Sequence, residues 1–131
     1  MQIFNAHEVG KFADEGPAKD AEIDENGYVR TGVIANDICS VAVAAFRDGQ
    51  IREKNHWHPH AAEIYYVIEG EGVATDAEGN QQRVSEGNVV YFDAGEPHNM
   101  HAAPGHDCKY YRVQVGGDRH ALDEDGPINA K

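Results

Sequence analysis

The chain has 131 residues, of which 40% are hydrophobic and 26% are charged, and this length and composition are typical of one soluble globular domain. Its formal net charge of −12 argues against a protein that binds nucleic acid, because phosphate backbones are bound by clusters of Lys and Arg and the 11 basic residues here are scattered. No apolar run is long enough to cross a membrane, and residues 1–10 lack a basic segment followed by an apolar core, so we expect neither a membrane protein nor a signal peptide.

The first part of the chain predicts two strands after a polar beginning. Residues 1–30 are polar, and the Asn-Gly pair at 26–27 is typical of a β-hairpin. Residues 29–34 predict a strand that Gly32 interrupts. Residues 38–46 form an apolar run between turn residues, which is the pattern of a strand buried on both faces.

Short strands separated by turns fill the rest of the chain. They are expected at residues 63–68, 72–75, 82–84, 88–92, 98–102 and 108–115. In the tail at 116–131 we expect at most one turn of helix. Many short strands at close spacing indicate an antiparallel sandwich or barrel, so the fold class is all-β.

The chain contains two cysteines, Cys39 and Cys108, which lie in apolar or aromatic surroundings. Two cysteines do not make a disulfide framework, and buried reduced thiols are the simplest interpretation. Reduced thiols in turn favour a cytoplasmic location.

Residues 56–63, with the sequence HWHPHAAE, combine three imidazoles with one carboxylate. On a β-strand, residues two apart point to the same side, so His56 and His58 converge, and a turn can bring Glu63 back to them. Two nitrogens and one oxygen around a point suit a divalent Fe, Mn, Ni, Cu or Zn ion. The histidine pair alone also fits a solvated, His-rich loop at a strand end, so the metal hypothesis depends on the rest of the chain.

A further candidate ligand, His98, lies 35 residues beyond Glu63. It follows the expected strand at 88–92 and a Gly-containing turn, so a neighbouring strand delivers one more imidazole. His98 can thereby complete a set of three histidines and one glutamate with His56 and His58.

At this point the sequence resembles the first motif of the cupin superfamily. That motif has the pattern HxH, four residues, Glu, six residues, Gly, and its usual preceding Gly is approximated here by Gly49, one residue too far away. The residues that match it at every interval are His56, His58, Glu63 and Gly70.

The second cupin motif is matched in part. Gly87, Gly95 and His98 stand at the expected intervals, whereas Asp93 replaces the usual Pro and Ala102 replaces the usual Asn. The lost Pro alters only a turn, and the lost Asn is not a metal ligand. Two correctly spaced motifs are much more specific than the histidine pair alone.

The resemblance implies an antiparallel jelly-roll β-barrel that holds one metal ion in its mouth and forms a homodimer. Residues 1–131 would be a single cupin-like domain, with the barrel at about 35–115, an N-terminal extension at 1–34 and a C-terminal tail at 116–131. The ion would be Fe, Mn, Ni, Zn, Co or Cu, with Fe(II) favoured, and burial of its polar ligands would be costly without it. The implied ligands are His56, His58, Glu63 and His98.

Three further residues are candidates for the site. Tyr65 shares the parity of Glu63 and should point into the barrel, where its phenol is either a core aromatic or a proton donor or base. Resemblance to cupin lyases that cleave dimethylsulfoniopropionate favours Tyr65 as the catalytic base. His60 is expected at the rim rather than among the ligands. Arg112 would bind a substrate carboxylate if its side chain faces the site.

Three functions remain open from the sequence. A metal-dependent dioxygenase acting on a small organic molecule ranks first, because four protein ligands leave open positions on an octahedral ion. A non-redox lyase or isomerase, with Tyr65 as the proton shuttle, ranks second. A small-molecule-binding or sensor module without turnover ranks third. The expected partner is a small-molecule substrate, with no nucleic acid and no membrane.

Overall fold

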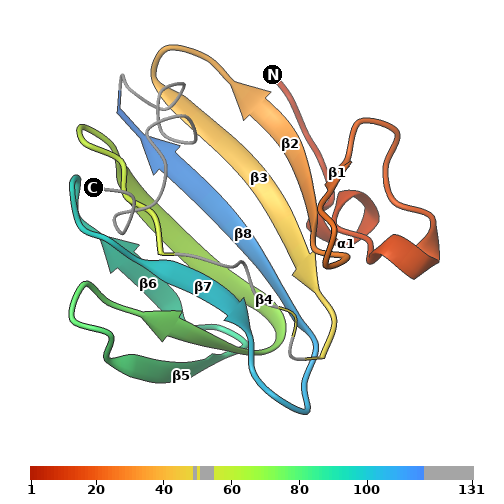
Figure 1. The fold of residues 1–131 in the computed structure, drawn as a ribbon. Coiled ribbons are helices and arrows are strands. Elements are labelled where there is room, and N and C mark those ends of the chain that lie inside the picture. The colour runs from red at the N-terminus through yellow and green to blue at the C-terminus, as the bar shows by residue number, and fades with distance from the viewer. Residues whose placement is uncertain (49, 51–54, 117–131) are drawn as a thin grey trace.

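Antiparallel strands make up most of the fold, as the computed structural model shows for residues 1–48, 50 and 55–116 (Figure 1). The expected turn of helix in the tail, and most of the tail itself, lie outside the described residues. The elements are α1 (Ala6–Val9), the 3₁₀ turn η1 (Ala13–Glu15), β1 (Glu22–Ile23), β2 (Val29–Ala35), β3 (Cys39–Phe46), β4 (Ala62–Thr75), β5 (Gln81–Ser85), β6 (Val89–Phe92), β7 (Asn99–Ala102) and β8 (Cys108–Val115).

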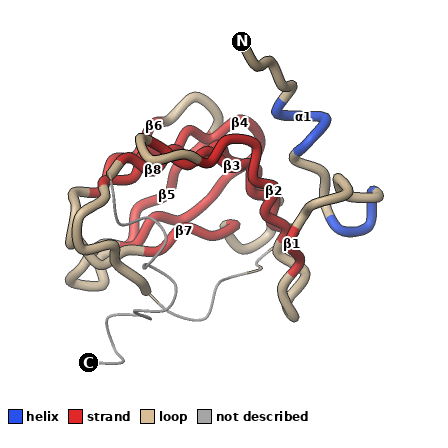
Figure 2. Tube along the Cα trace, turned by 90° about the horizontal axis from the view of Figure 1, so that it is seen from above, coloured by secondary structure: helices blue, strands red, loops and turns tan. Residues whose placement is uncertain are grey.

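Strand β4 belongs to two layers of the barrel. Its first half pairs with β8 and β6, and its second half pairs with β5 and β7, all antiparallel. The large layer continues from β8 through β3 and β2 to β1. Seen from above, β5 and β7 lie opposite this large layer (Figure 2). The all-β, antiparallel jelly-roll fold expected from the sequence is confirmed.

Gly70 lies where β4 passes from one layer to the other. Its φ is +81°, which L side chains rarely adopt, and a Cβ at this position would lie 1.9 Å from the backbone oxygen of Asp107. The register between β4 and β8 also shifts between Val67 and Glu69. Glycine is therefore required here by both the bend and the close approach of β8.

The predicted hairpin at 26–27 is present, because β1 and β2 pair across a turn in which Gly27 has a φ of +86°. The pairing of β2 with β3 shifts register between Gly32 and Ile34, which agrees with the interruption expected at Gly32. The sheet thus begins at β1, inside the segment that the sequence assigns to the N-terminal extension.

The side chains that face the inside of the barrel change from polar to apolar along β3, β8 and β4. At the apolar end, Phe46 is fully buried and its ring stacks on Tyr28 at 4.3 Å between centroids. The polar end carries the candidate site. The inward-facing neighbours, taken from the polar end in the order β3, β8 and β4, are Ser40, Gln114 and Glu63, then Ala42, Arg112 and Tyr65, then Ala44, Tyr110 and Val67.

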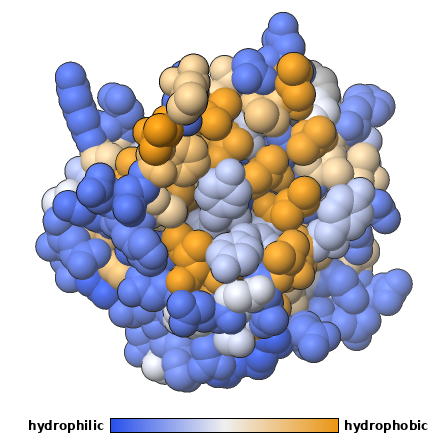
Figure 3. Space-filling view, turned by 180° about the vertical axis from the view of Figure 1, so that it is seen from behind, coloured by the Kyte–Doolittle hydropathy of each residue, from blue (hydrophilic) through white to orange (hydrophobic). Residues whose placement is uncertain are grey.

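The outer face of the large layer is apolar. Figure 3 shows apolar side chains gathered on this face of the molecule. The N-terminal segment covers part of it, where Phe12 packs with Val29 and Ala45. The part over β4 and β6 stays open, with Tyr66 41% and Val89 62% exposed.

The two helical elements of the described residues are short. Among the described residues, no helix is long and apolar enough to cross a membrane.

Candidate metal centre

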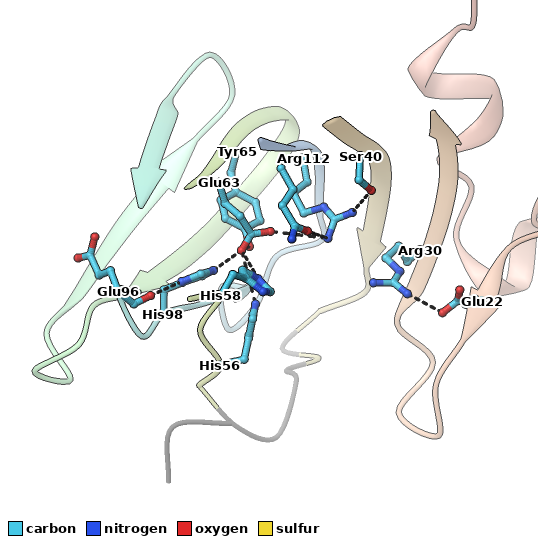
Figure 4. A network of polar contacts seen from close by, with 11 residues as sticks. Glu22, Arg30, Ser40, His56, His58, Glu63, Tyr65, Glu96, His98 and Arg112 are labelled. Atoms are coloured by element: carbon cyan, nitrogen blue, oxygen red, sulfur yellow. Dashed lines mark hydrogen bonds and ion pairs between the residues drawn. The ribbon is translucent and has the colours of Figure 1, made fainter. Parts of the chain in front are cut away.

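The structure brings together four of the predicted site residues. One ligand atom from each lies within 4.8 Å of those of the others, and all but one of the side chains are buried. Figure 4 shows the histidines arranged around the carboxylate. The four residues are His56, His58, Glu63 and His98.

Backbone pairing explains why residues so far apart in sequence meet. His56 and His98 stand opposite each other in an antiparallel bridge, with N–H to O distances of 3.0 Å and 2.8 Å. Gly95 N–H donates to the carbonyl of His58 at 2.7 Å. The chain then turns at residues 59–60 and enters β4, which presents Glu63 to the same space.

The carboxylate of Glu63 lies at the centre of the group. Its Oε1 is 2.8 Å from Nε2 of His58 and 3.7 Å from Nε2 of His56, and it is in close polar contact with Nε2 of His98. Burial alone raises the pKa of Glu63, but hydrogen bonds from the three histidines outweigh burial and hold this pKa well below its ordinary value. Glu63 is therefore an ionised acceptor.

The donor set fits a cation. Nδ1 of His98 lies 2.7 Å from the carbonyl oxygen of Glu96, which can only accept, so Nδ1 carries a proton and Nε2 is the ring nitrogen that would coordinate an ion. Nδ1 of His58 and the Oε2 atom of Glu63 are buried, and no residue in the described part of the chain offers either of them a hydrogen bond. A metal ion held by the Nε2 atoms and the carboxylate would place a positive charge among these buried polar atoms.

Tyr65 supports the carboxylate from inside the barrel. Its hydroxyl donates to Oε1 of Glu63 at 3.1 Å. Burial raises the pKa of Tyr65 well above its ordinary value, and the negative charge of Glu63 raises it further, so the phenol keeps its proton. The side chain points inward as the parity with Glu63 predicts, and it is buried in the core.

The side chain of Arg112 also faces the site. The sequence had left open which way this side chain points. Its Nη1 lies 3.6 Å from Oε2 of Glu63 and donates to Oε1 of Gln114 at 3.3 Å. Its Nη2 donates to Oγ of Ser40 at 3.3 Å. The guanidinium thus lies between the carboxylate and strand β3 (Figure 4).

Sequence reasoning missed two residues of the site, Phe92 and Gln114. The ring of Phe92 stacks on His98 at 4.3 Å with an interplanar angle of 12°. Both residues stand opposite Glu63 on the neighbouring strands. This pairing is the signal that would identify them, and it needs the register between strands, which the sequence does not give.

His60 does not join the ligands. It is exposed in the turn before β4 and is absent from the metal-like group, which agrees with a place at the rim. His7 and His106 are exposed and His101 is half-buried, whereas His120 lies outside the described residues.

Comparison with known proteins finds a matching family model and similar solved structures. A family model described as "Cupin domain" matches residues 42–113, whereas no curated protein matches the chain. The chain is similar to a conserved protein with a double-stranded β-helix domain from Klebsiella pneumoniae, with 20% identity, coverage of 90% of this chain and 92% of that one, and a TM-score of 0.72.

Two other similar structures have more specific names. One is a predicted oxalate decarboxylase from Thermotoga maritima, with 23% identity, coverage of 74% of this chain and 90% of that one, and a TM-score of 0.64. The other is KdgF from Halomonas sp., with 23% identity, coverage of 80% and 93%, and a TM-score of 0.65. At these identities the likeness shows the fold alone.

Proposed function

Because the chain belongs to the cupin family, we propose that it is a metal-dependent enzyme that acts on a small organic molecule by a dioxygenase-type reaction. The observation that carries the proposal is the buried group of three histidines and one glutamate, whose ligand atoms lie within 4.8 Å of one another. A purely structural role would not need these polar groups to converge at the mouth of a barrel.

Three imidazole nitrogens and one carboxylate oxygen suit a divalent Fe, Mn, Co, Ni, Cu or Zn ion, and Fe(II) is the choice for a dioxygenase. When bound, such an ion supplies Lewis acidity and, for iron, redox chemistry with dioxygen. The chain offers four donors, fewer than the six of an octahedral ion, so room for substrate remains.

The surrounding residues hold the ligands in place. The carbonyl of Glu96 fixes the tautomer of His98, and the ring of Phe92 fixes its plane. The hydroxyl of Tyr65 orients the carboxylate of Glu63. These contacts hold the candidate ligands in one orientation.

A non-redox lyase or isomerase is the second candidate, and the position of Tyr65 favours it. A phenol that is 3.1 Å from the candidate ligand Glu63 is placed to give a proton to a departing group.

Elemental analysis tests the metal site itself. The wild type and a His58→Ala, His98→Ala double variant are purified without added metal, and we expect about one ion per chain in the wild type and almost none in the variant. Equal metal content in the two proteins would contradict the proposal.

Oxygen uptake then separates the reactions. The metal-loaded wild type is given diketones, catechols and thiols in an oxygen electrode, and a dioxygenase consumes oxygen with at least one class while the double variant does not. Conversion of a substrate without oxygen would identify the non-redox alternative. Binding of a small molecule without conversion would identify a sensor module.

We also propose that two copies associate through the open part of the apolar outer face. Each copy carries a net charge of −12, so copies repel one another wherever charged residues meet. The outward positions of β4 and β6 at this face are uncharged: Ile64, Tyr66, Val89 and Tyr91. A second copy can therefore cover this face without placing like charges together.

Light scattering after size exclusion tests the dimer. We expect a mass about twice the 14.4 kDa of one chain for the wild type, and close to one chain for Tyr66→Glu. Gln82→Glu, which adds the same charge at an exposed position of β5, is the matched control and should stay dimeric. A monomeric wild type would refute the proposal.

A further inference from the structure

We propose that the substrate is a small organic acid whose carboxylate binds Arg112 and Gln114 next to the metal centre. This inference rests on the proposed metal-dependent function, and it names the class of molecule that this site takes. It is carried by the register of β8, by two buried donors without acceptors, and by the charges of the site.

The register of β8 places both side chains beside the candidate ligands. Gln114 stands between Ser40 of β3 and Glu63 of β4, and Arg112 stands one inward step further, between Ala42 and Tyr65. The two residues are two apart on one strand, so their side chains point to the same side.

Each of these side chains has one buried donor for which the described residues supply no acceptor. Arg112 is 11% exposed at its side chain and Gln114 is 1% exposed, yet Nε of Arg112 and Nε2 of Gln114 have no hydrogen-bond partner in the described part of the chain. Buried donors without acceptors destabilise a protein, so an acceptor is expected to fill this place. A carboxylate accepts at both oxygens and matches the planar fork of an arginine.

The ion pair with Glu63 does not meet this need. Nη1 of Arg112 lies 3.6 Å from Oε2 of Glu63, which is beyond hydrogen-bond distance, and none of the described residues donates a hydrogen bond to Oε2. Glu63 is also the carboxylate that would hold the metal ion. With a divalent cation bound, the negative charge of Glu63 would face the positive charges of both the ion and the guanidinium of Arg112. The buried charges would then be positive in sum, which favours binding of an additional anion.

The residues on the β3 side of Arg112 are small. Its cross-strand neighbour is Ala42, and the neighbour of Ala42 on β2 is Gly32. A Cβ added at Gly32 would meet no heavy atom within 4 Å. The row that contains Arg112 therefore has small residues on one side, which suits a molecule of a few carbon atoms.

Calorimetry on the zinc-loaded full chain tests the inference, because zinc is redox-inert and binding is measured without turnover. The probes are acetate, malonate and succinate, each compared with its neutral amide. We expect at least one acid to bind about tenfold or more tighter than its amide, and Arg112→Met to lose about tenfold or more of that affinity. Arg112→Lys should recover only part of it, because an ammonium lacks the planar fork.

Controls separate this role from a structural one. Metal content is measured for every variant, and Arg83→Met, which removes an exposed arginine from β5, should bind acids like the wild type. If Arg112→Met does not fold, Gln114→Met replaces it, with an expected loss of about threefold or more at unchanged metal content.

Two results would overturn the inference: acids that bind no better than their amides, or acid binding that is the same in the folded variants and the wild type. If instead the wild type takes up no metal, the proposed function fails. The same titration of the metal-free chain then still decides whether Arg112 and Gln114 bind a carboxylate.

Discussion

Gly70 offers a direct test of how the fold positions the site, because β4 turns there after presenting Glu63 and Tyr65. We consider Gly70→Ala. The substitution introduces a side chain at a φ of +81° and places its Cβ 1.9 Å from the backbone oxygen of Asp107. A backbone oxygen cannot swing away like the end of a side chain, so β4 and β8 must move apart.

Two contributions add to the expected loss of stability. A non-glycine residue in the left-handed region costs about 1–2 kcal/mol. Forced displacement of a packed backbone costs roughly 1–3 kcal/mol more, by analogy with overpacked cores. We therefore expect Gly70→Ala to lower the free energy of unfolding by about 2–5 kcal/mol.

Gly79→Ala is the matched control. Gly79 has a φ of +84°, almost the same as Gly70, but a Cβ there meets no heavy atom within 4 Å. It should lose only the first contribution, about 1–2 kcal/mol. Urea titration of both variants, followed by circular dichroism, measures the difference. Equal losses in the two variants would refute the reasoning, because the close approach of Asp107 would then have no effect.

Three further predictions concern the site and the thiols. Tyr65→Phe should lose about 1 kcal/mol in urea titration and at least tenfold in turnover of any substrate found, with unchanged metal content, because only the hydrogen bond to Glu63 is removed. In the metal-free protein, the pKa of Glu63 in the folded chain lies below its ordinary value of 4.5. The ionised carboxylate therefore stabilises the fold at pH values above 4.5, and this stabilisation is lost as the pH falls through the pKa of the folded state. Urea midpoints should therefore fall on acidification more steeply in the wild type than in Glu63→Gln. Ellman's reagent should modify half-buried Cys39 in the native protein but not Cys108, whose pKa burial raises to about 12.

The strand pattern was accessible from the sequence because apolar runs and turn residues alternate along it. The run at 38–46 produced β3, and the Asn-Gly pair at 26–27 produced the hairpin that precedes it. The strand at 29–34 was expected as well, whereas the two-residue strand β1 was not predicted. A strand as short as β1 has no periodicity of its own, and it forms because β2 offers it an edge.

The candidate site was accessible only in part. The spacing of His56 and His58 and the parity of Tyr65 are local properties, and both could be read along one strand. The approach of His98 depends on a bridge between segments far apart in sequence, so residue spacing alone did not establish it and the family motif did. The inward direction of Arg112 depends on the register between β8 and β4, which no local pattern encodes.

The backbone segments that carry the candidate ligands differ in how they are hydrogen-bonded, and this difference affects the rate at which a bound metal ion would exchange. Glu63 lies on β4, which is hydrogen-bonded on both edges. His56 pairs with His98 in an isolated bridge that lies outside the named strands. Amide hydrogens of β4 should therefore exchange with solvent only when the whole barrel unfolds, whereas residues 55–58 can open in a local fluctuation. Metal exchange would then follow the opening rate of this short segment while the barrel stays folded, and hydrogen exchange in deuterated water would measure that rate.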